Sequence, residues 1–140
     1  MRLFILLLLL VAPGATVAAG GPVAYQVQGE RFEGYYQNPG GQAPLVLLVH
    51  DWDGLTDYEI RRAKMLAERG YAVFAVDLLG AGLRPTAVED KKAQTARLYQ
   101  DRERMRTLLQ GGLQAAREQG GNIANSVAMG YCVGGAAVLE

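Results

Sequence analysis

The sequence contains very little of the residue types that bind metals or cross-link chains. Its 140 residues include one cysteine, Cys132, one histidine, His50, and one tryptophan, Trp52. A single cysteine excludes an internal disulfide, so the thiol is either buried and inert, paired with another chain, or kept for its reactivity. No cluster of cysteine and histidine could bind a metal, and we expect neither a metal nor a cofactor.

The chain also has no excess of charge of one sign, and beyond its first residues it has no long apolar segment. The 14 basic residues balance the 14 acidic ones, which gives no indication of nucleic acid as a partner. Beyond the first residues no apolar run approaches the roughly 20 residues that span a bilayer, so we expect no membrane span. Gly80 and Gly82 follow a predicted strand, but Pro85 stands where a dinucleotide-binding loop needs its third glycine.

The first 19 residues have the layout of a secretory signal peptide. Arg2 precedes an apolar run over residues 3–12, and small residues end the segment at Ala18 and Ala19. We therefore expect export to the periplasm or the medium, with an uncleaved anchor as the alternative. Residues 20–140 then form one small domain with its own core.

The apolar pattern of this domain predicts strands. Alternation and turn residues indicate an antiparallel hairpin of residues 23–27 and 31–37. Three continuous apolar runs suit strands buried on both faces of a parallel sheet, and they cover residues 44–50, 71–77 and 126–132.

Two helical segments separate these runs. The first covers residues 57–69 and starts with the capping-box spacing of Thr56 and Glu59. The second starts with the same spacing at Thr86 and Glu89 and extends to about residue 119, with interruptions predicted near Asp101 and at residues 111–112. Strands that alternate with helices predict an α/β fold with a doubly wound, mostly parallel sheet.

Residues 130–134 bear the chemistry, because they match the pattern Gly-x-nucleophile-x-Gly with cysteine as the nucleophile. The pattern lies between a predicted strand and a helix start, where the central residue adopts a strained conformation that projects its side chain. Gly130 and Gly134 allow neighbouring backbone to come close. The helix start favours an ionised Cys132 thiol, and the Val133 N–H would face a developing oxyanion.

This elbow, GYCVGG, and residues 47–82, LLVHDWDGLTDYEIRRAKMLAERGYAVFAVDLLGAG, resemble the dienelactone hydrolase family of the α/β-hydrolase fold. The resemblance implies that Cys132 is the nucleophile and that the N–H groups of Trp52 and Val133 form the oxyanion hole. It also implies that Asp51 takes the place of the acidic residue that contacts the resting thiol. The implied substrates are small esters or lactones. The family's acid and histidine base would follow Cys132, where no histidine occurs, so the C-terminal half of the fold would be absent.

Other interpretations stay open. Cys132 could be an inert or a redox-sensing thiol, and the chain a hydrolase-like fragment that binds a ligand or partner without turnover. For His50 we favour a strand-end residue bonded to backbone, and for Arg84 a solvated loop charge rather than a substrate clamp. Trp52 could act through its backbone alone. The oligomeric state is not determined by these patterns.

Overall fold

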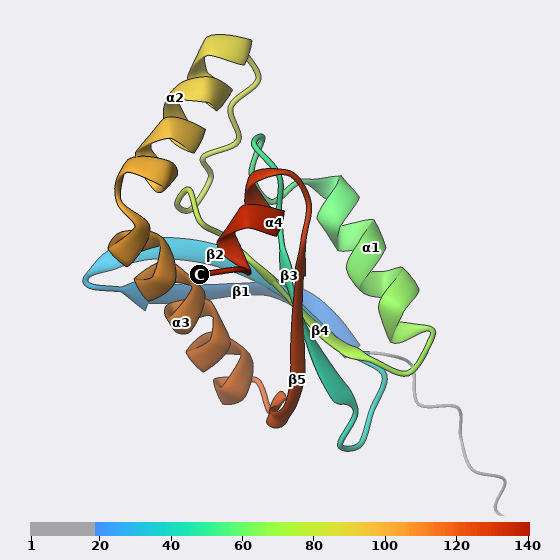
Figure 1. Cartoon of the computed structure of the whole chain (residues 1–140). Helices are drawn as coiled ribbons and strands as arrows, with labels where there is room; N and C mark the ends of the chain where they lie inside the picture. The colour runs from blue at the N-terminus through green and yellow to red at the C-terminus, as the bar shows by residue number, and fades with distance from the viewer. Residues whose placement is uncertain (1–18) are drawn as a thin grey trace, which may run out of the picture.

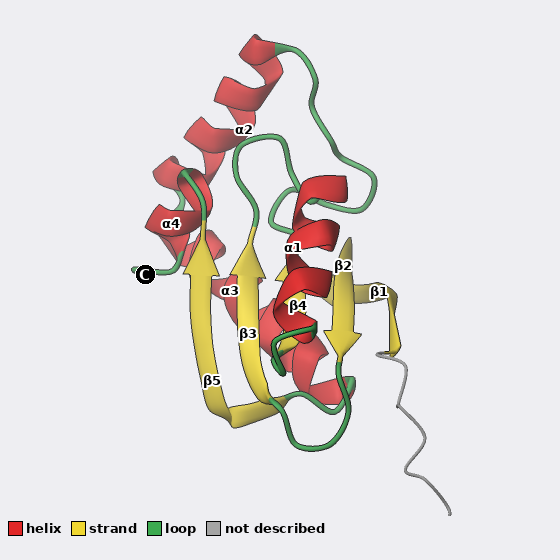
Figure 2. Cartoon of the chain, turned by 90° about the vertical axis from the view of Figure 1, so that its right-hand side faces the viewer, coloured by secondary structure: helices red, strands yellow, loops and turns green. Residues whose placement is uncertain are grey.

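A computed structural model describes residues 19–140, so the predicted signal peptide lies outside the described residues apart from Ala19. The described chain builds one sheet in the order β1-β2-β4-β3-β5 (Figure 2). Its strands are β1 (Ala19–Val27), β2 (Glu30–Asn38), β3 (Pro44–Val49), β4 (Ala72–Val76) and β5 (Asn122–Gly130). Its helices are α1 (Asp57–Ala67), α2 (Val88–Gln100), α3 (Arg102–Glu118) and α4 (Val133–Ala137).

The sheet is mixed rather than mostly parallel, which corrects the prediction. Strand β3 pairs in parallel with β4 and with β5, as expected for the apolar runs. The predicted hairpin of β1 and β2 is confirmed, but it joins the same sheet because β2 pairs antiparallel with β4. The carboxyl ends of β3 and β5 therefore meet at one edge of the sheet, where α4 begins (Figure 2).

Helices cover both faces of the sheet, which confirms a doubly wound arrangement. Helix α3 lies on one face and α1 on the other (Figure 1). The α3 side holds the larger apolar core, with Phe74 and Met105 at its centre, and the α1 side holds a smaller one around Leu48 and Ala63. Alternate residues of β3 and β4 enter the two cores, so these strands need apolar residues at every position.

The first predicted capping box is confirmed and the second is wrong. The Thr56 N–H donates to Glu59 Oε2 at 2.8 Å, and the Thr56 hydroxyl accepts from the Tyr58 N–H. Helix α2, in contrast, begins after Ala87, without a side-chain cap. Because this start comes one residue later than the spacing requires, Glu89 pairs with Lys92 instead of reaching back.

The break predicted near Asp101 is confirmed, because its carboxylate caps α3 by accepting from the Arg104 N–H at 2.9 Å. The break predicted at residues 111–112 is wrong, since α3 continues through both glycines. A Cβ at Gly112 would lie 2.7 Å from the Val76 side chain. These glycines bring the helix close to the sheet, and the packing gained there outweighs their weak helix propensity.

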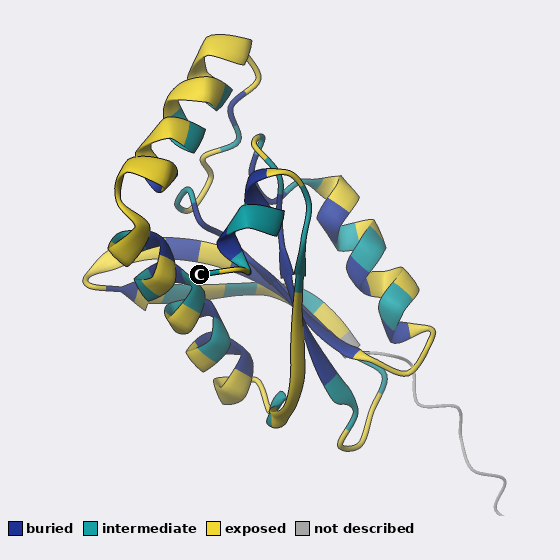
Figure 3. Cartoon of the chain, in the orientation of Figure 1, coloured by how far each residue is buried: buried dark blue, intermediate teal, exposed yellow. Residues whose placement is uncertain are grey.

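Strand β5 begins earlier than predicted and ends at Gly130, so Cys132 lies beyond it. Within residues 19–140, β5 pairs with β3 alone, and much of it is exposed (Figure 3). None of the described helices has the length and apolar character needed to cross a bilayer.

Substitution of Leu48 by Ala should lower the free energy of unfolding by about 2–5 kcal/mol, because the side chain is fully buried in β3. Urea denaturation of residues 20–140 measures this. Leu139→Ala is the matched control, because Leu139 is 87% exposed, and its effect should stay within about 0.5 kcal/mol. Equal effects of the two substitutions would contradict the assignment of the core.

Candidate active site

Cys132 occupies the turn between β5 and α4 with φ 52° and ψ −116°. Positive φ is costly for a residue with a side chain, and among the described non-glycine residues only Gln28 shares it. The residue is exposed in residues 19–140, so the interpretation as a buried cysteine is wrong, while its reactivity stays a prediction. An exposed residue at positive φ between a strand and a helix is the geometry of the predicted elbow.

The elbow packs directly against the end of β3. The Tyr131 N–H donates to the Val49 carbonyl at 3.3 Å, and the Gly134 N–H closes the turn on the Tyr131 carbonyl at 2.8 Å. A Cβ at Gly134 would lie 2.6 Å from the Val49 carbonyl oxygen, and one at Gly130 would lie 2.8 Å from the Gly135 nitrogen. Both glycines are therefore required by close backbone contacts.

A cavity of about 450 Å³ adjoins the elbow through Tyr131, the neighbour of Cys132. The loop after β3, the start of α1 and the elbow contribute its walls. Its lining residues are Asp51, Asp53, Thr56, Tyr58, Glu59 and Tyr131. The structure thus brings Asp51 and the elbow to the same edge of the sheet, while the contact between Asp51 and the Cys132 thiol stays a prediction.

Two carboxyl groups interact in the loop after β3. The Asp53 N–H donates to Asp51 Oδ1 at 3.1 Å. Burial raises the pKa of Asp51 to about 6, and a side-chain hydrogen bond with Asp53 also raises it. The same hydrogen bond lowers the pKa of Asp53, and Lys91 lowers it further. Near neutral pH, Asp51 is therefore the group in this loop that can take up or release a proton.

Glu59 lies behind this pair and is almost fully buried. Its Oε2 is bound by Thr56, while Oε1 has no hydrogen-bond partner in the described part of the chain. Its negative charge also contributes to the raised pKa of Asp51. Even so, no three histidine, cysteine or acidic side chains of residues 19–140 converge to hold a metal ion.

His50 is a structural residue, as favoured from the sequence. Its Nε2 accepts from the Leu78 N–H at 3.0 Å, and its Nδ1 lies 2.5 Å from the Asp51 carbonyl oxygen. A carbonyl only accepts, so Nδ1 carries the proton and the ring is neutral. Burial lowers the pKa of His50, which keeps it neutral. With both nitrogens bonded, the ring links the ends of β3 and β4.

Arg84 is not a solvated loop charge, which corrects the sequence interpretation. Its Nη1 donates to the Leu83 carbonyl at 2.8 Å and lies 3.7 Å from the Asp77 carboxylate, while its Nε donates to the Leu55 carbonyl. The side chain therefore holds the loop after β4 against the loop after β3. Its bonds are internal to the fold.

The Trp52 indole lies outside the apolar cores and is 36% exposed. The Lys91 ammonium of α2 lies 5.4 Å from the ring centroid and 3.5 Å from Asp53 Oδ2. Sequence reasoning did not identify Lys91, and it could not, because the contact joins elements far apart in the chain.

An aromatic group beside the elbow was also missed. The rings of Tyr58 and Tyr131 meet edge to face at 5.6 Å, and the Arg62 Nε donates to the Tyr131 hydroxyl at 3.1 Å. The position of Tyr131 within the elbow pattern was the only signal for this group.

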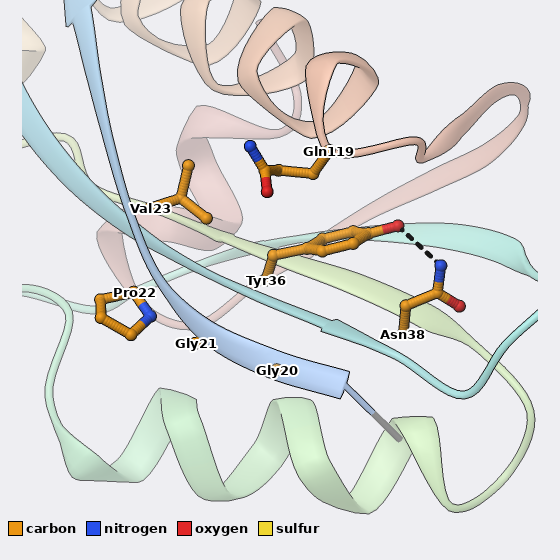
Figure 4. A pocket seen from close by; sticks show the side chains of 7 residues that line it. All are labelled: Gly20, Gly21, Pro22, Val23, Tyr36, Asn38 and Gln119. Carbon is orange, nitrogen blue, oxygen red and sulfur yellow. Dashed lines mark hydrogen bonds between the residues drawn. The ribbon is translucent and has the colours of Figure 1, made fainter. Parts of the chain in front are cut away.

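A second cavity, of about 420 Å³, lies at the opposite end of the sheet, and Figure 4 shows the side chains that line it. It is bounded by the start of β1, by Tyr36 and Asn38 of β2, and by Gln119 after α3. It contains no carboxylate or thiol, and the elbow lies at the other ends of β3 and β5. We therefore place the candidate site at the elbow.

Substitution of Gly134 by Ala should destabilise the protein by about 1–3 kcal/mol, because its Cβ would meet backbone atoms that cannot move away. Gly135→Ala is the matched control, since its Cβ would lie 3.4 Å from the Gly130 oxygen. Urea denaturation compares the two variants. A smaller loss for Gly134→Ala than for Gly135→Ala would contradict the close packing of the elbow.

Replacement of Asp51 by Asn should stabilise the protein by an amount that grows between about pH 4 and 6 and stays constant from there to pH 8. The pKa of about 6 in the folded state exceeds the unfolded value of about 4, so the wild type loses stability between about pH 4 and 6, where only the unfolded chain has given up this proton. Asp53→Asn should have the opposite sign near pH 7, because the pKa of Asp53 is lowered by folding. Urea midpoints across this pH range measure both effects, and parallel curves for Asp51→Asn and wild type would refute the raised pKa.

Comparisons with known proteins place this geometry in a family. The model of the dienelactone hydrolase family matches residues 32–140. Among curated proteins, none matches the chain. A solved structure named m3DLH superimposes with a TM-score of 0.83 at 29% identity, over 90% of this chain and 53% of that one.

Two further solved structures are similar. A dienelactone hydrolase-like promiscuous phosphotriesterase from metagenomic libraries has a TM-score of 0.80 at 27% identity, over 87% of this chain and 52% of that one. For the dienelactone hydrolase from Anabaena variabilis, at 20% identity, the TM-score is 0.66 over 87% of this chain and 56% of that one, which shows a shared fold. The chain spans about half the length of these structures. Because the family model matches most of its residues, the chain belongs to the dienelactone hydrolase family.

Proposed function

We propose that this chain carries the nucleophile and oxyanion-binding portion of a hydrolase for small esters or lactones. The observation that carries the proposal is the conformation of Cys132, an exposed thiol at positive φ between a strand and a helix. Residues in strained backbone conformations cost free energy and are concentrated at active sites. Membership of the dienelactone hydrolase family supports hydrolysis as the general activity.

In the proposed reaction the Cys132 thiolate attacks the carbonyl carbon of the substrate. The carbonyl π electrons move to oxygen, and the N–H groups of Trp52 and Val133 stabilise the resulting anion. Val133 is the first residue of α4, where an N–H has no partner within the helix. Collapse of this intermediate expels the alkoxide, which takes up the proton that the thiol lost and leaves as the alcohol, so that a thioester remains on Cys132. Water then releases the acid and regenerates the thiol.

We assign Asp51 the role of proton acceptor for the resting thiol. Its raised pKa suits a carboxylate that exchanges a proton near neutral pH. The second half-reaction also needs a base that activates water. His50 is bonded at both nitrogens, so we do not assign it that role.

Because both nitrogens of His50 are bonded to backbone groups, a second candidate function is also favoured, that of a hydrolase-like domain that binds a ligand without turnover. One similar structure is described as a phosphotriesterase, so aryl phosphotriesters should be tested as substrates in addition to esters and lactones. These candidates differ in whether a covalent intermediate forms on Cys132.

Incubation of the chain with p-nitrophenyl acetate should release about one equivalent of p-nitrophenolate in a burst and leave an acetyl group on Cys132, since the first step needs no external base. Mass spectrometry locates the adduct. Cys132→Ala should abolish the burst, and iodoacetamide should label folded Cys132 faster than the same thiol in urea. A chain that shows no burst, with alkylation no faster than in urea, would favour binding without catalysis.

A further inference from the structure

Helix α2 projects away from the sheet and is mostly exposed (Figures 1 and 3). Among its residues, all of which the structure describes, Leu98 alone is buried, and it lies in the second half of the helix. In the first half the Lys91 side chain is only 18% exposed, against 61% for Lys92. The amino-terminal half of α2 is thus held close to the rest of the protein at Lys91.

Lys91 makes two contacts, and both reach the loop after β3. Its ammonium lies 3.5 Å from the Asp53 carboxylate and 5.4 Å from the centroid of the Trp52 ring. A cation that is partly desolvated between a carboxylate and an indole face binds more strongly than one in an exposed ion pair. These contacts therefore restrict both the backbone and the indole of the loop.

The position of Lys91 is unfavourable for the helix itself. It lies in the first turn of α2, beside the positive end of the helix dipole, where acidic residues such as Glu89 and Asp90 are preferred. The contacts with Asp53 and Trp52 offset this repulsion. The placement of the cation is therefore explained by the loop rather than by the helix.

We propose that Lys91 is a positioning residue for the loop after β3, which faces the elbow. Lys91 holds Asp53 and the Trp52 indole, and so fixes the Trp52 N–H and the Asp51 carboxyl of that loop. The contacts of Lys91 with this loop are present in the folded chain whether or not Cys132 is catalytic. Its consequence for Cys132 rests on the proposed function.

The contacts continue from Lys91 through Asp53 to Asp51, whose Oδ1 accepts from the Asp53 N–H at 3.1 Å. The groups that face this carboxyl pair are Glu59 from α1, neutral His50 at the end of β3, Lys91 from α2 and the phenols of Tyr58 and Tyr131. Lys91 stabilises the negative charge of the pair. Its removal should raise the pH at which the pair loses its second proton, a step that belongs to the pair as a whole.

Trp52 is the only tryptophan of the chain, so its fluorescence reports on this loop alone. Lys91→Met should shift the emission of Trp52, increase its quenching by acrylamide and raise the pH midpoint of its fluorescence titration above about 6. Lys91→Arg should restore all three, because a guanidinium can replace the ammonium in both contacts. Lys92→Met, which removes an exposed lysine from the next position, should match the wild type. Unchanged fluorescence in Lys91→Met would overturn the proposal.

The rate of acetyl transfer from p-nitrophenyl acetate to Cys132 tests the consequence for the elbow. Lys91→Met should lower this rate by about tenfold or more, since small displacements of catalytic groups have large effects on rate, while Lys92→Met leaves it unchanged. An altered fluorescence with an unaltered transfer rate would overturn the positioning role and leave the proposed function intact. If the wild type transferred no acetyl group, the proposed function would fail, and the fluorescence of the variants alone would decide whether Lys91 holds the loop.

Discussion

The parallel pairing of β3 with β5 is the constraint on which the candidate site depends. Parallel strands bring their carboxyl ends to one edge of the sheet, so the loop after β3 and the elbow after β5 become neighbours. The backbone contact between Gly134 and the Val49 carbonyl then sets their separation. A side chain at that glycine would push the two loops apart, and Cys132 would lose its place beside the loop that bears Asp51.

Several polar side chains keep this edge in place without taking part in the proposed chemistry. Neutral His50 joins the ends of β3 and β4, and Arg84 joins the loops that follow them. Both bind backbone groups that would otherwise be buried without partners, which explains why polar residues occur among apolar strands. Their removal would disturb the positions of Asp51 and Trp52 rather than a proton transfer.

The candidate site contains three acidic side chains, only one of which is paired with a lysine. Asp51, Asp53 and Glu59 line one cavity, and Lys91 compensates for Asp53 from a helix that otherwise has little contact with the sheet. The pKa of Asp51 rises as a result of burial and of its bond to Asp53, while the pKa of Asp53 falls. Two neighbouring carboxyl groups with separated pKa values allow one to hold a proton while the other stays ionised.

The sequence by itself determined the elements whose signals are local. Apolar runs identified β3 and β4, the Thr56 and Glu59 spacing identified the start of α1, and the glycines around Cys132 identified the elbow. These signals depend on residues a few positions apart, which share a strand, a turn or a helix end whatever the rest of the chain does.

Only the tertiary structure decided the rest. The sequence predicts a break at the two glycines of α3, whereas the helix continues through them because they allow its close approach to Val76. The bonds of Arg84 to Leu55 and of Lys91 to Asp53 join separate elements, and so does the antiparallel pairing that makes the sheet mixed. Contacts of this kind follow from how strands and helices pack, and no spacing within one segment records them.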